Sequence, residues 1–390
     1  MSPKYKGEDG KSSQLFMSNL HILVTGGAGF IGSHLVDALI ERGHRVRVLD
    51  ALVSQVHGAA EGPPEFLHKD AEFMRGDVCD ADAVAKALDG VDAVYHEAAE
   101  VGVGQSMYEI RRYVKANDYG TAVLLEEIVK RRSQIRKLVV ASSMSIYGEG
   151  AYQGADGAVH HPQLRAKTQL EARQWEFTDA DGPELRLAPT PESKPLFPTS
   201  VYAVSKQDQE QYCLIVGRAY NIPAVALRYF NVYGSRQALS NPYTGVCAIF
   251  SSRLLNNQAP VIFEDGEQSR DFVHVSDIVQ ANLLALETDG ADYQAVNIGT
   301  GRPTSVKQIC QLLARGLGKD IAPEIVGKYR EGDIRHCVAD ISKARKMLGY
   351  EPTVILEDGL AELLAWLGTQ KAEDKVEGAT AELASRALVK

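Results

Sequence analysis

The stretch HILVTGGAGFIGSHLVDALIE, residues 21–41, decides the fold. It opens with an apolar run typical of a buried strand and continues in a helical pattern that begins at Phe30. A turn with the spacing G-x-x-G-x-x-G separates the two. Glycines at such a turn let the backbone approach a pyrophosphate, whose charge the helix N-terminus stabilises. The cofactor contacts predicted here are Gly26, Gly29, Phe30, Ile31 and Gly32.

Strands and helices alternate for about 200 residues after this turn. Further strands are predicted over 45–50, before 77, and over 93–96, 137–143 and 224–230. Helices are predicted over 30–42, 80–88, 111–130 and 202–218. This βαβ alternation predicts a Rossmann-type α/β fold, with a parallel, doubly wound sheet.

Acidic residues at the ends of the second and third strands favour a particular cofactor. A carboxylate at Asp50 can accept hydrogen bonds from adenosine ribose hydroxyls and would repel a 2'-phosphate. NAD is therefore favoured over NADP. Asp77, with Val78, is a candidate contact on the adenine side, although Asp77 is equally well interpreted as a helix N-cap.

The segment YAVSK, residues 202–206, places a tyrosine and a lysine one helical turn apart. A free phenol has a pKa of about 10, so a base near neutral pH needs a shift of roughly 3 units. An ammonium on the same helical face can supply much of that shift. The pair is common by chance, but together with Ser143 and the glycine turn Tyr202 and Lys206 predict nicotinamide redox chemistry on an alcohol.

Composition excludes several other classes of protein. The formal net charge is -9, which argues against a nucleic-acid surface. The five cysteines are far apart and include no C-x-x-C pair, as expected in a reducing compartment. There is no signal-peptide pattern and no run of 18 apolar residues. We therefore expect a soluble, cytoplasmic protein with no membrane partner.

The domain organisation follows from changes in composition. Residues 1–19 are polar and predict a flexible extension. Residues 20–230 predict the cofactor domain, interrupted by an insertion over 149–198 that carries one helix candidate at 164–177. This insertion is interpreted as a lid, an interface element or a partly ordered excursion. Residues 231–368 predict a smaller, mixed α/β substrate lobe, and 369–390 a flexible tail.

With these motifs in hand, the chain resembles the extended short-chain dehydrogenase/reductases, and within them the nucleotide-sugar epimerases and dehydratases. The resemblance runs from His21 to about Leu367. It also includes, in the family's order, HEAAEVGVGQS (96–106), NDYGT (117–121), RYFNVYG (228–234), RDFVHVSD (270–277) and REGD (330–333).

The resemblance implies a role for each matching residue. Tyr202 would be the general base and Lys206 would tune it while binding the nicotinamide ribose. Ser143 would share the proton network, and Asn117 would support it. Ala98 and Asn117 would join the cofactor site. The implied substrate contacts, with structural ion pairs as the alternative for the arginines, are Ser143, Ser145, Asn231, Arg270, Arg330 and Asp333. Relatives pair through the helices that carry Asn117 and Tyr202, so a homodimer is expected.

The residues after Ser143 discriminate between reactions within the family. Met144 and Ser145 stand where the family's 4,6-dehydratases carry Asp and Glu, and related decarboxylases and 3,5-epimerising reductases carry Glu or Cys at the second position. What is left is oxidation and re-reduction at one carbon, hence C4 epimerisation through a transient 4-keto sugar. A net reductase or a non-catalytic NAD sensor are the alternatives, although a sensor typically lacks part of the tyrosine/lysine pair.

The whole set of motifs looks most like dTDP-L-rhamnose 4-epimerases, which make dTDP-6-deoxy-L-talose. UDP-glucose or UDP-glucuronate 4-epimerases are the close alternative. Many members of the first group carry cysteine pairs in the insertion that could bind a metal. This insertion has no cysteine, only His160 and His161, which we interpret as solvated loop residues, so no metal is predicted.

Overall fold

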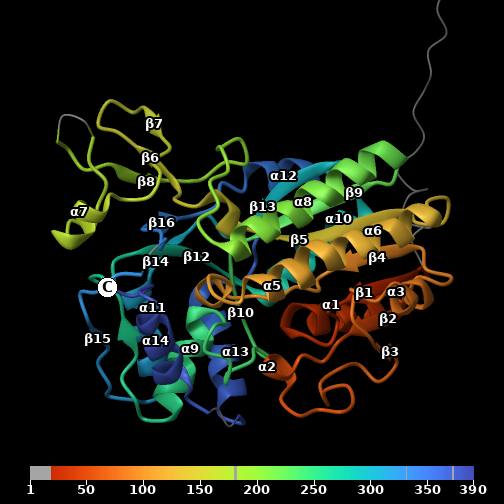
Figure 1. The fold of residues 1–390 in the computed structure, drawn as a ribbon, viewed down its shortest axis with the longest axis horizontal. Coiled ribbons are helices and arrows are strands. Elements are labelled where there is room, and N and C mark those ends of the chain that lie inside the picture. The colour runs from red at the N-terminus through yellow and green to blue at the C-terminus, as the bar shows by residue number, and fades with distance from the viewer. Residues whose placement is uncertain (1–18, 180–181, 331, 371–372) are drawn as a thin grey trace, which may run out of the picture.

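A computed structural model describes residues 19–179, 182–330, 332–370 and 373–390 (Figure 1). The predicted N-terminal extension, apart from its last residue, lies outside these ranges. Among the described residues, no helix has both the length and the apolar character needed to span a membrane.

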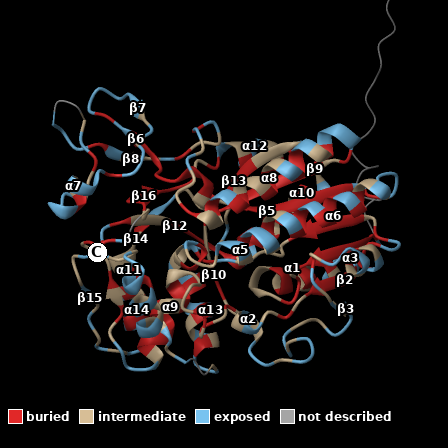
Figure 2. Ribbon diagram, viewed as in Figure 1, coloured by how far each residue is buried: buried red, intermediate tan, exposed pale blue. Residues whose placement is uncertain are grey.

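A seven-stranded parallel sheet forms the centre of the molecule and confirms the predicted Rossmann-type fold. Its strand order is β13-β9-β5-β4-β1-β2-β3. The strands are β1 (His21–Thr25), β2 (Arg45–Asp50), β3 (Glu72–Arg75), β4 (Ala93–His96), β5 (Lys137–Ser143), β9 (Ala224–Tyr229) and β13 (Gln294–Ile298). The inner strands are buried along almost their whole length (Figure 2), because helices cover both faces of the sheet.

Two hydrophobic cores lie on opposite faces of this sheet, since successive strand side chains point to opposite sides. Val24 and Val48 pack with α1 (Phe30–Glu41) and α10 (Val275–Glu287). Leu23 and Leu49 pack on the other face, in the core that includes residues of α3 (Ala81–Ala87), α6 (Gly120–Lys130) and α8 (Val201–Tyr220). The helix predicted over 111–130 consists of α5 (Ile110–Tyr113), a π-helical turn η1 (Val114–Tyr119) and α6.

The second lobe is mixed α/β, as predicted. β10 (Asn231–Tyr233) and β16 (His336–Cys337) pair parallel with β12 (Ser269–His274), and β14 (Pro303–Ser305) pairs with it antiparallel. Strands β11 (Val261–Ile262) and β15 (Glu324–Ile325) form a separate pair. The apolar faces of α9 (Val246–Leu255), α11 (Val306–Gly316) and α13 (Leu356–Leu367) form its core.

The boundary between the two lobes differs from the expected one at residue 230. Helix α10 and strand β13 come later in the chain but return to the central sheet, where β13 pairs with β9. The apolar strand pattern of β13 resembles that of the earlier strands, but only the sheet itself determines which edge it joins. The cofactor domain is therefore discontinuous in sequence.

The insertion is an ordered small unit rather than a long loop (Figure 1). Strands β7 (Val159–His160), β6 (Ala151–Gln153) and β8 (Arg186–Ala188) form an antiparallel sheet in that order. The expected helix over 164–177 is reduced to α7 (Lys167–Glu171), because Arg173 adopts the left-handed conformation with φ 56°. Tyr152, Phe177 and Leu185 make its small core.

The C-terminal tail also differs from the flexible segment expected from residue 369. Residues 376–385 form α14 (Val376–Ser385), and its buried Leu383 lies against Gly104 of α4 (Val103–Ser106). Arg253 of α9 lies 3.0 Å from Asp374. The tail is ordered by contacts with distant segments, which its Ala- and Glu-rich composition does not reveal.

Candidate functional site

The glycine turn packs α1 directly against the end of β1. Gly26 has φ +70° and its N–H donates to the Leu49 carbonyl at 2.8 Å. A Cβ on Gly32 would lie 2.4 Å from the Gly26 carbonyl oxygen, and one on Gly26 would lie 2.8 Å from the backbone of Ala98. Side chains are thus sterically excluded, and the turn is held between β2 and the segment after β4.

The first turn of α1 offers free backbone donors. Gly29 is the N-cap residue, and no side chain of the described residues caps the helix. The helix start opens on a cavity of about 350 Å³, whose lining includes Ala28, Gly29, Phe30, Arg236, Trp366 and Gln370. Unpaired N–H groups at a helix N-terminus form an anion site. The turn therefore fits the pyrophosphate of a dinucleotide.

Asp50 lies beside this turn at the end of β2. Its Oδ2 accepts from the Ala28 N–H at 3.0 Å and its Oδ1 from the Leu52 N–H at 2.9 Å. These bonds fix the carboxylate between the two loops. Each oxygen has a second lone pair for a ribose hydroxyl, so the residue fits the role predicted for it.

The region after β3 places the two predicted adenine-side contacts. Asp77 is exposed and accepts from the Cys79 N–H at 2.9 Å, whereas Val78 is buried. The N-cap of α3 is Asp80, which accepts from the N–H groups of Asp82 and Ala83. Asp77 is therefore not the helix cap, and the alternative interpretation of this residue is wrong.

Ser143, Ser145 and Tyr202 lie together at the carboxyl end of β5. Ser143 Oγ accepts from the Ser145 N–H at 3.2 Å and from Ser145 Oγ at 2.9 Å. Burial raises the pKa of Tyr202, and a hydrogen bond with Ser143 opposes that rise only in part. The pKa of the phenol in this structure is thus raised, whereas a lowering by Lys206 was expected.

Lys206 belongs to a buried polar network instead. Its Nζ donates to Gln209 Oε1 at 2.8 Å, while Gln209 Nε2 donates to Thr121 Oγ1 at 2.9 Å and lies 3.1 Å from His96 Nε2. Burial lowers the pKa of Lys206 to about 8, and the Glu97 carboxylate opposes that shift. Gln209, Thr121 and Glu97 are absent from the predicted site because the contacts that join β4, α6 and α8 here link residues distant in sequence.

Asn117 joins the segment after β4 to the helix of the tyrosine. It lies in the π-helical turn η1, fully buried. Its Oδ1 accepts from the Glu100 N–H at 2.7 Å, and its Nδ2 donates to Ser205 Oγ at 2.9 Å. The same α8 turn receives a second contact, since the Tyr202 N–H donates to Ser106 Oγ at 3.0 Å. Asn117 therefore ties the segment after β4 to the turn of α8 that carries Tyr202.

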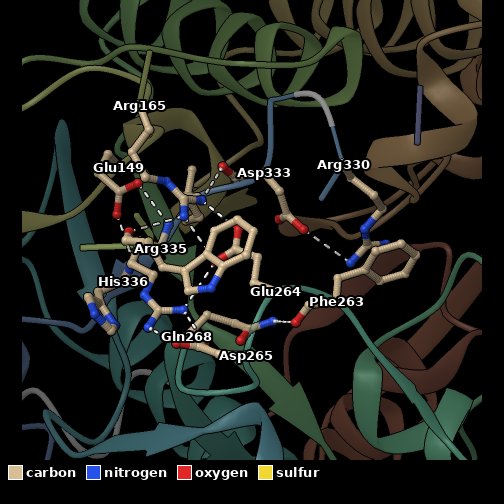
Figure 3. A network of polar contacts seen from close by, with 12 residues as sticks. Glu149, Arg165, Phe263, Glu264, Asp265, Gln268, Arg330, Asp333, Arg335 and His336 are labelled. Carbon is tan, nitrogen blue, oxygen red and sulfur yellow. Dashed lines mark hydrogen bonds and ion pairs between the residues drawn. The ribbon is translucent and has the colours of Figure 1, made fainter. Parts of the chain in front are cut away.

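Three of the predicted substrate residues, Arg270, Arg330 and Asp333, lie together in the second lobe, and Figure 3 shows Arg330 beside Asp333. Asp333 lies 3.2 Å from Arg330 Nη2 and 3.7 Å from Arg270 Nη2. Burial alone would raise the pKa of Asp333, but Arg330, Arg270 and Arg165 lower it. Asn231 Oδ1 is buried without a hydrogen-bond partner in the described part of the chain. Two arginines, Arg270 and Arg330, thus face one carboxylate, and the surplus positive charge fits a diphosphate.

The two histidines of the insertion differ in how far they are buried. His161 is exposed, as expected, but His160 Nε2 is buried beside the Gly154 turn. No group of three or more His, Cys, Asp or Glu side chains in the described ranges is arranged to hold a metal ion.

Comparisons with known proteins agree with this geometry. The chain matches the NAD dependent epimerase/dehydratase family over residues 22–169 and 179–299. It is 37% identical to a dTDP-L-rhamnose 4-epimerase of Burkholderia thailandensis over 353 residues, which cover 90% of this chain and 95% of that protein.

Solved structures show the same fold. The UDP-glucose 4-epimerase of Thermotoga maritima, solved with UDP-glucose, is 36% identical with a TM-score of 0.73 and covers 90% of this chain and 99% of its own. The UDP-glucuronic acid 4-epimerase of Bacillus cereus, solved with UDP-glucuronic acid and NAD, is 29% identical with a TM-score of 0.72 and the same coverage.

Proposed function

The chain belongs to the NAD dependent epimerase/dehydratase family, and from this premise we propose that it inverts C4 of a nucleoside-diphosphate sugar through a transient 4-keto intermediate. The observation that carries the proposal is the placement of Tyr202 beside Ser143. The two residues after Ser143, Met144 and Ser145, include no acid. Tyr202 and Ser143 can therefore exchange a proton with one sugar hydroxyl, and Met144 and Ser145 add no acid for a second step.

NAD is the cofactor, and the residues of the first lobe fit it. The free N–H groups at the start of α1 would hold the pyrophosphate, and Asp50 the adenosine ribose. When bound, oxidised NAD supplies a positive charge and a hydride acceptor that is regenerated within the cycle. The chain's own residues bind and orient it and move the proton.

Tyr202 would take the proton of the sugar C4 hydroxyl and later return one. Its raised pKa in this structure means that the phenol needs added positive charge nearby to act as a base. Lys206, held by Gln209, is the protein's own cation on the same face of α8. Ser143 would hydrogen-bond the substrate hydroxyl. Its Oγ accepts hydrogen bonds from Ser145, so its own hydroxyl proton can be donated to the substrate.

Elimination chemistry lacks an acid at the two positions after Ser143. Removing water across C5 and C6 requires an acid and a base in addition to the tyrosine. Met144 is buried and apolar, and Ser145 is a hydroxyl engaged with Ser143. A 4,6-dehydratase is therefore not proposed.

For the substrate we propose dTDP-L-rhamnose, which would give dTDP-6-deoxy-L-talose. The 37% identity to the Burkholderia thailandensis enzyme over nearly its whole length supports this choice. A UDP-sugar, UDP-glucose or UDP-glucuronate, is the second candidate, because the Thermotoga maritima enzyme is 36% identical. A net reductase acting on a 4-keto sugar would use the same residues but would consume reduced cofactor.

We propose a homodimer formed through α5, η1 and α8. These helices expose seven large apolar side chains, namely Ile110, Val114, Tyr119, Val204, Tyr212, Ile215 and Tyr220. An apolar face of this extent is typical of a protein interface. The five cysteines are free thiols, which supports a reducing, cytoplasmic location.

The decisive experiment is incubation of the purified protein with dTDP-, UDP- and GDP-sugars without added NAD, followed by separation of the epimers. We expect inversion of one sugar by copurified cofactor, with no net change in absorbance at 340 nm. Steady loss of added NADH absorbance would identify a reductase, and absence of turnover with every sugar would refute the proposal.

A further inference from the structure

The insertion is joined to the second lobe by buried ion pairs centred on Arg335 (Figure 3). We call this set of side chains the insertion clamp; it comprises Glu149, Arg165 and Glu176 of the insertion, Glu264 and Asp265 after β11, and Arg335 before β16. The three segments are far apart in sequence and are brought together here by side chains. The clamp is separate from the glycine turn and from Tyr202.

Arg335 is the centre of the clamp and is only 1% exposed. Its Nη1 donates to Asp265 Oδ1 at 2.7 Å and to Glu264 Oε2 at 3.1 Å, and its Nε donates to Glu176 Oε1 at 2.8 Å. A planar guanidinium with several carboxylate partners is fixed in both position and orientation.

Glu149 fixes the backbone of the same residue. Its Oε2 accepts from the Arg335 N–H and its Oε1 from the His336 N–H, both at 2.7 Å. Burial alone would raise the pKa of Glu176, but hydrogen bonds from His336 and Arg335 lower it to about 2. Glu176 is thus ionised at neutral pH and holds the Arg335 side chain while Glu149 holds its main chain.

Arg165 extends the clamp towards the predicted diphosphate site. Its two terminal nitrogens donate to the two oxygens of Glu264 at 2.7 and 2.9 Å. One of them also lies 3.3 Å from the Asp333 carbonyl oxygen. The insertion therefore contacts the main chain at both 333 and 335.

The main chain between these two points orients Arg270. The carbonyl oxygens of Ile334 and Arg335 accept from Arg270 Nη2 and Nη1 at 2.8 and 2.9 Å. A shift of this short segment would move both acceptors together, so the clamp, together with the pairing of β16 with β12, sets the direction of Arg270.

We propose that Glu149, Arg165 and Glu176 of the insertion are positioning residues that hold Arg270 in the orientation that binds the substrate diphosphate. The inference rests on the proposed function, because it assigns the ligand of Arg270 from it. It gives the insertion a role in substrate affinity. The clamp residues would act through Arg270 rather than by binding substrate themselves.

The test compares Glu176→Gln with Glu351→Gln, a matched change in an exposed ion pair with Arg345 that is not part of the clamp. Binding of UDP and dTDP, and of UMP and dTMP, is measured by calorimetry on each variant. We expect Glu176→Gln to weaken diphosphate binding roughly tenfold, as loss of one charge-assisted hydrogen bond would. Monophosphate binding, copurified NAD and the control variant should be unchanged.

Kinetics supply a second readout on the same proteins. With the sugar that turns over, KM should rise about as much as the diphosphate Kd, with kcat little changed, because the clamp does not touch the reacting atoms. Arg165→Lys, which keeps the charge but loses the two-pronged contact with Glu264, should show the same pattern if Glu176→Gln proves too unstable to purify.

Three outcomes separate the failure of this inference from that of the proposed function. If the unmodified protein binds UDP or dTDP and both variants bind them equally well, the clamp has no positioning role. The same holds if the variants lose monophosphate and diphosphate binding alike. If the unmodified protein binds no nucleoside diphosphate, the proposed function is wrong and this inference is overturned with it.

Discussion

Gln209 accepts a 2.8 Å hydrogen bond from Lys206 one helical turn away, and through its amide nitrogen links that lysine to Thr121 and His96. Burial and then Lys206 lower the pKa of His96 to about 3, so this imidazole is neutral. The groups linked to Lys206 through Gln209 are therefore uncharged and buried. The charge of Lys206 is balanced mainly by Glu97.

Glu97→Gln should shift the pH dependence of activity. Glu97 raises the pKa of Lys206, which burial lowers to about 8, so removing the carboxylate should lower that pKa further. The lysine would then lose its proton at lower pH. We expect the alkaline limb of kcat/KM to move down by about one pH unit. Glu126→Gln, an exposed residue on α6, is the control. An unchanged alkaline limb in Glu97→Gln would show that Lys206 does not govern the pH dependence.

Tyr202→Phe should abolish turnover while leaving the cofactor bound. The phenyl ring keeps the packing against Tyr113, whose ring centroid lies 6.4 Å away, but cannot exchange a proton. Loss of a general base lowers rates by about 10²–10⁴-fold. Copurified NAD is quantified by chromatography after denaturation. Tyr212→Phe, an exposed tyrosine on the same helix, is the control; activity retained by Tyr202→Phe would exclude the mechanism.

Gly32→Ala should disrupt the cofactor turn. The added Cβ would lie 2.4 Å from the Gly26 carbonyl oxygen, so α1 or the turn must shift. We expect a loss of about 1–3 kcal/mol in unfolding free energy and loss of copurified NAD. Gly378→Ala in α14, where an added Cβ meets nothing within 4 Å, serves as control. Normal NAD content in Gly32→Ala would contradict the placement of the pyrophosphate.

Local patterns account for the part of this fold that the sequence could predict. The glycine turn, Asp50 and the YAVSK pair lie within continuous stretches whose spacing reflects one strand and one helix. Their positions in the structure follow directly, because parallel strands bring their carboxyl ends to one edge of the sheet.

Long-range contacts account for what the sequence could not predict. Gln209 is one polar residue among several on α8, and only its neighbours from β4 and α6 make it part of the site. The insertion has strands of two or three residues, too short to show alternation. Helix α14 shows no strong apolar period, and its order comes from Leu383 against Gly104. The raised pKa of Tyr202 likewise results from burial, which spacing does not show.

Leu383→Ala should loosen both the tail and the segment next to the tyrosine. Leu383 is 8% exposed and packs on Gly104 of α4, whose Ser106 accepts from the Tyr202 N–H. Removing the side chain leaves a cavity, with a cost of about 2–3 kcal/mol. Hydrogen exchange should increase over 101–108 and 373–390. Leu388→Ala, on a less buried tail residue, is the control. Unchanged exchange over 101–108 would show that the tail does not support this segment.

Asp118→Asn should stabilise the protein above neutral pH. Burial, then a hydrogen bond with Asp208, raises the pKa of Asp118 to about 7, well above the usual value for a carboxyl. The folded state therefore binds this proton more tightly than the unfolded state, so stability falls as pH rises from about 4 to 7.

The amide removes that penalty. After discounting for solvent screening of a partly exposed group, we expect a gain of roughly 1–2 kcal/mol at pH 8 and little change at pH 4. Chemical denaturation at the two pH values measures the difference. Because the pair lies on η1 and α8, the helices of the proposed dimer, the gain should be larger at protein concentrations where the dimer forms. An equal effect at pH 4 and pH 8 would mean that the two carboxyl groups do not share a proton.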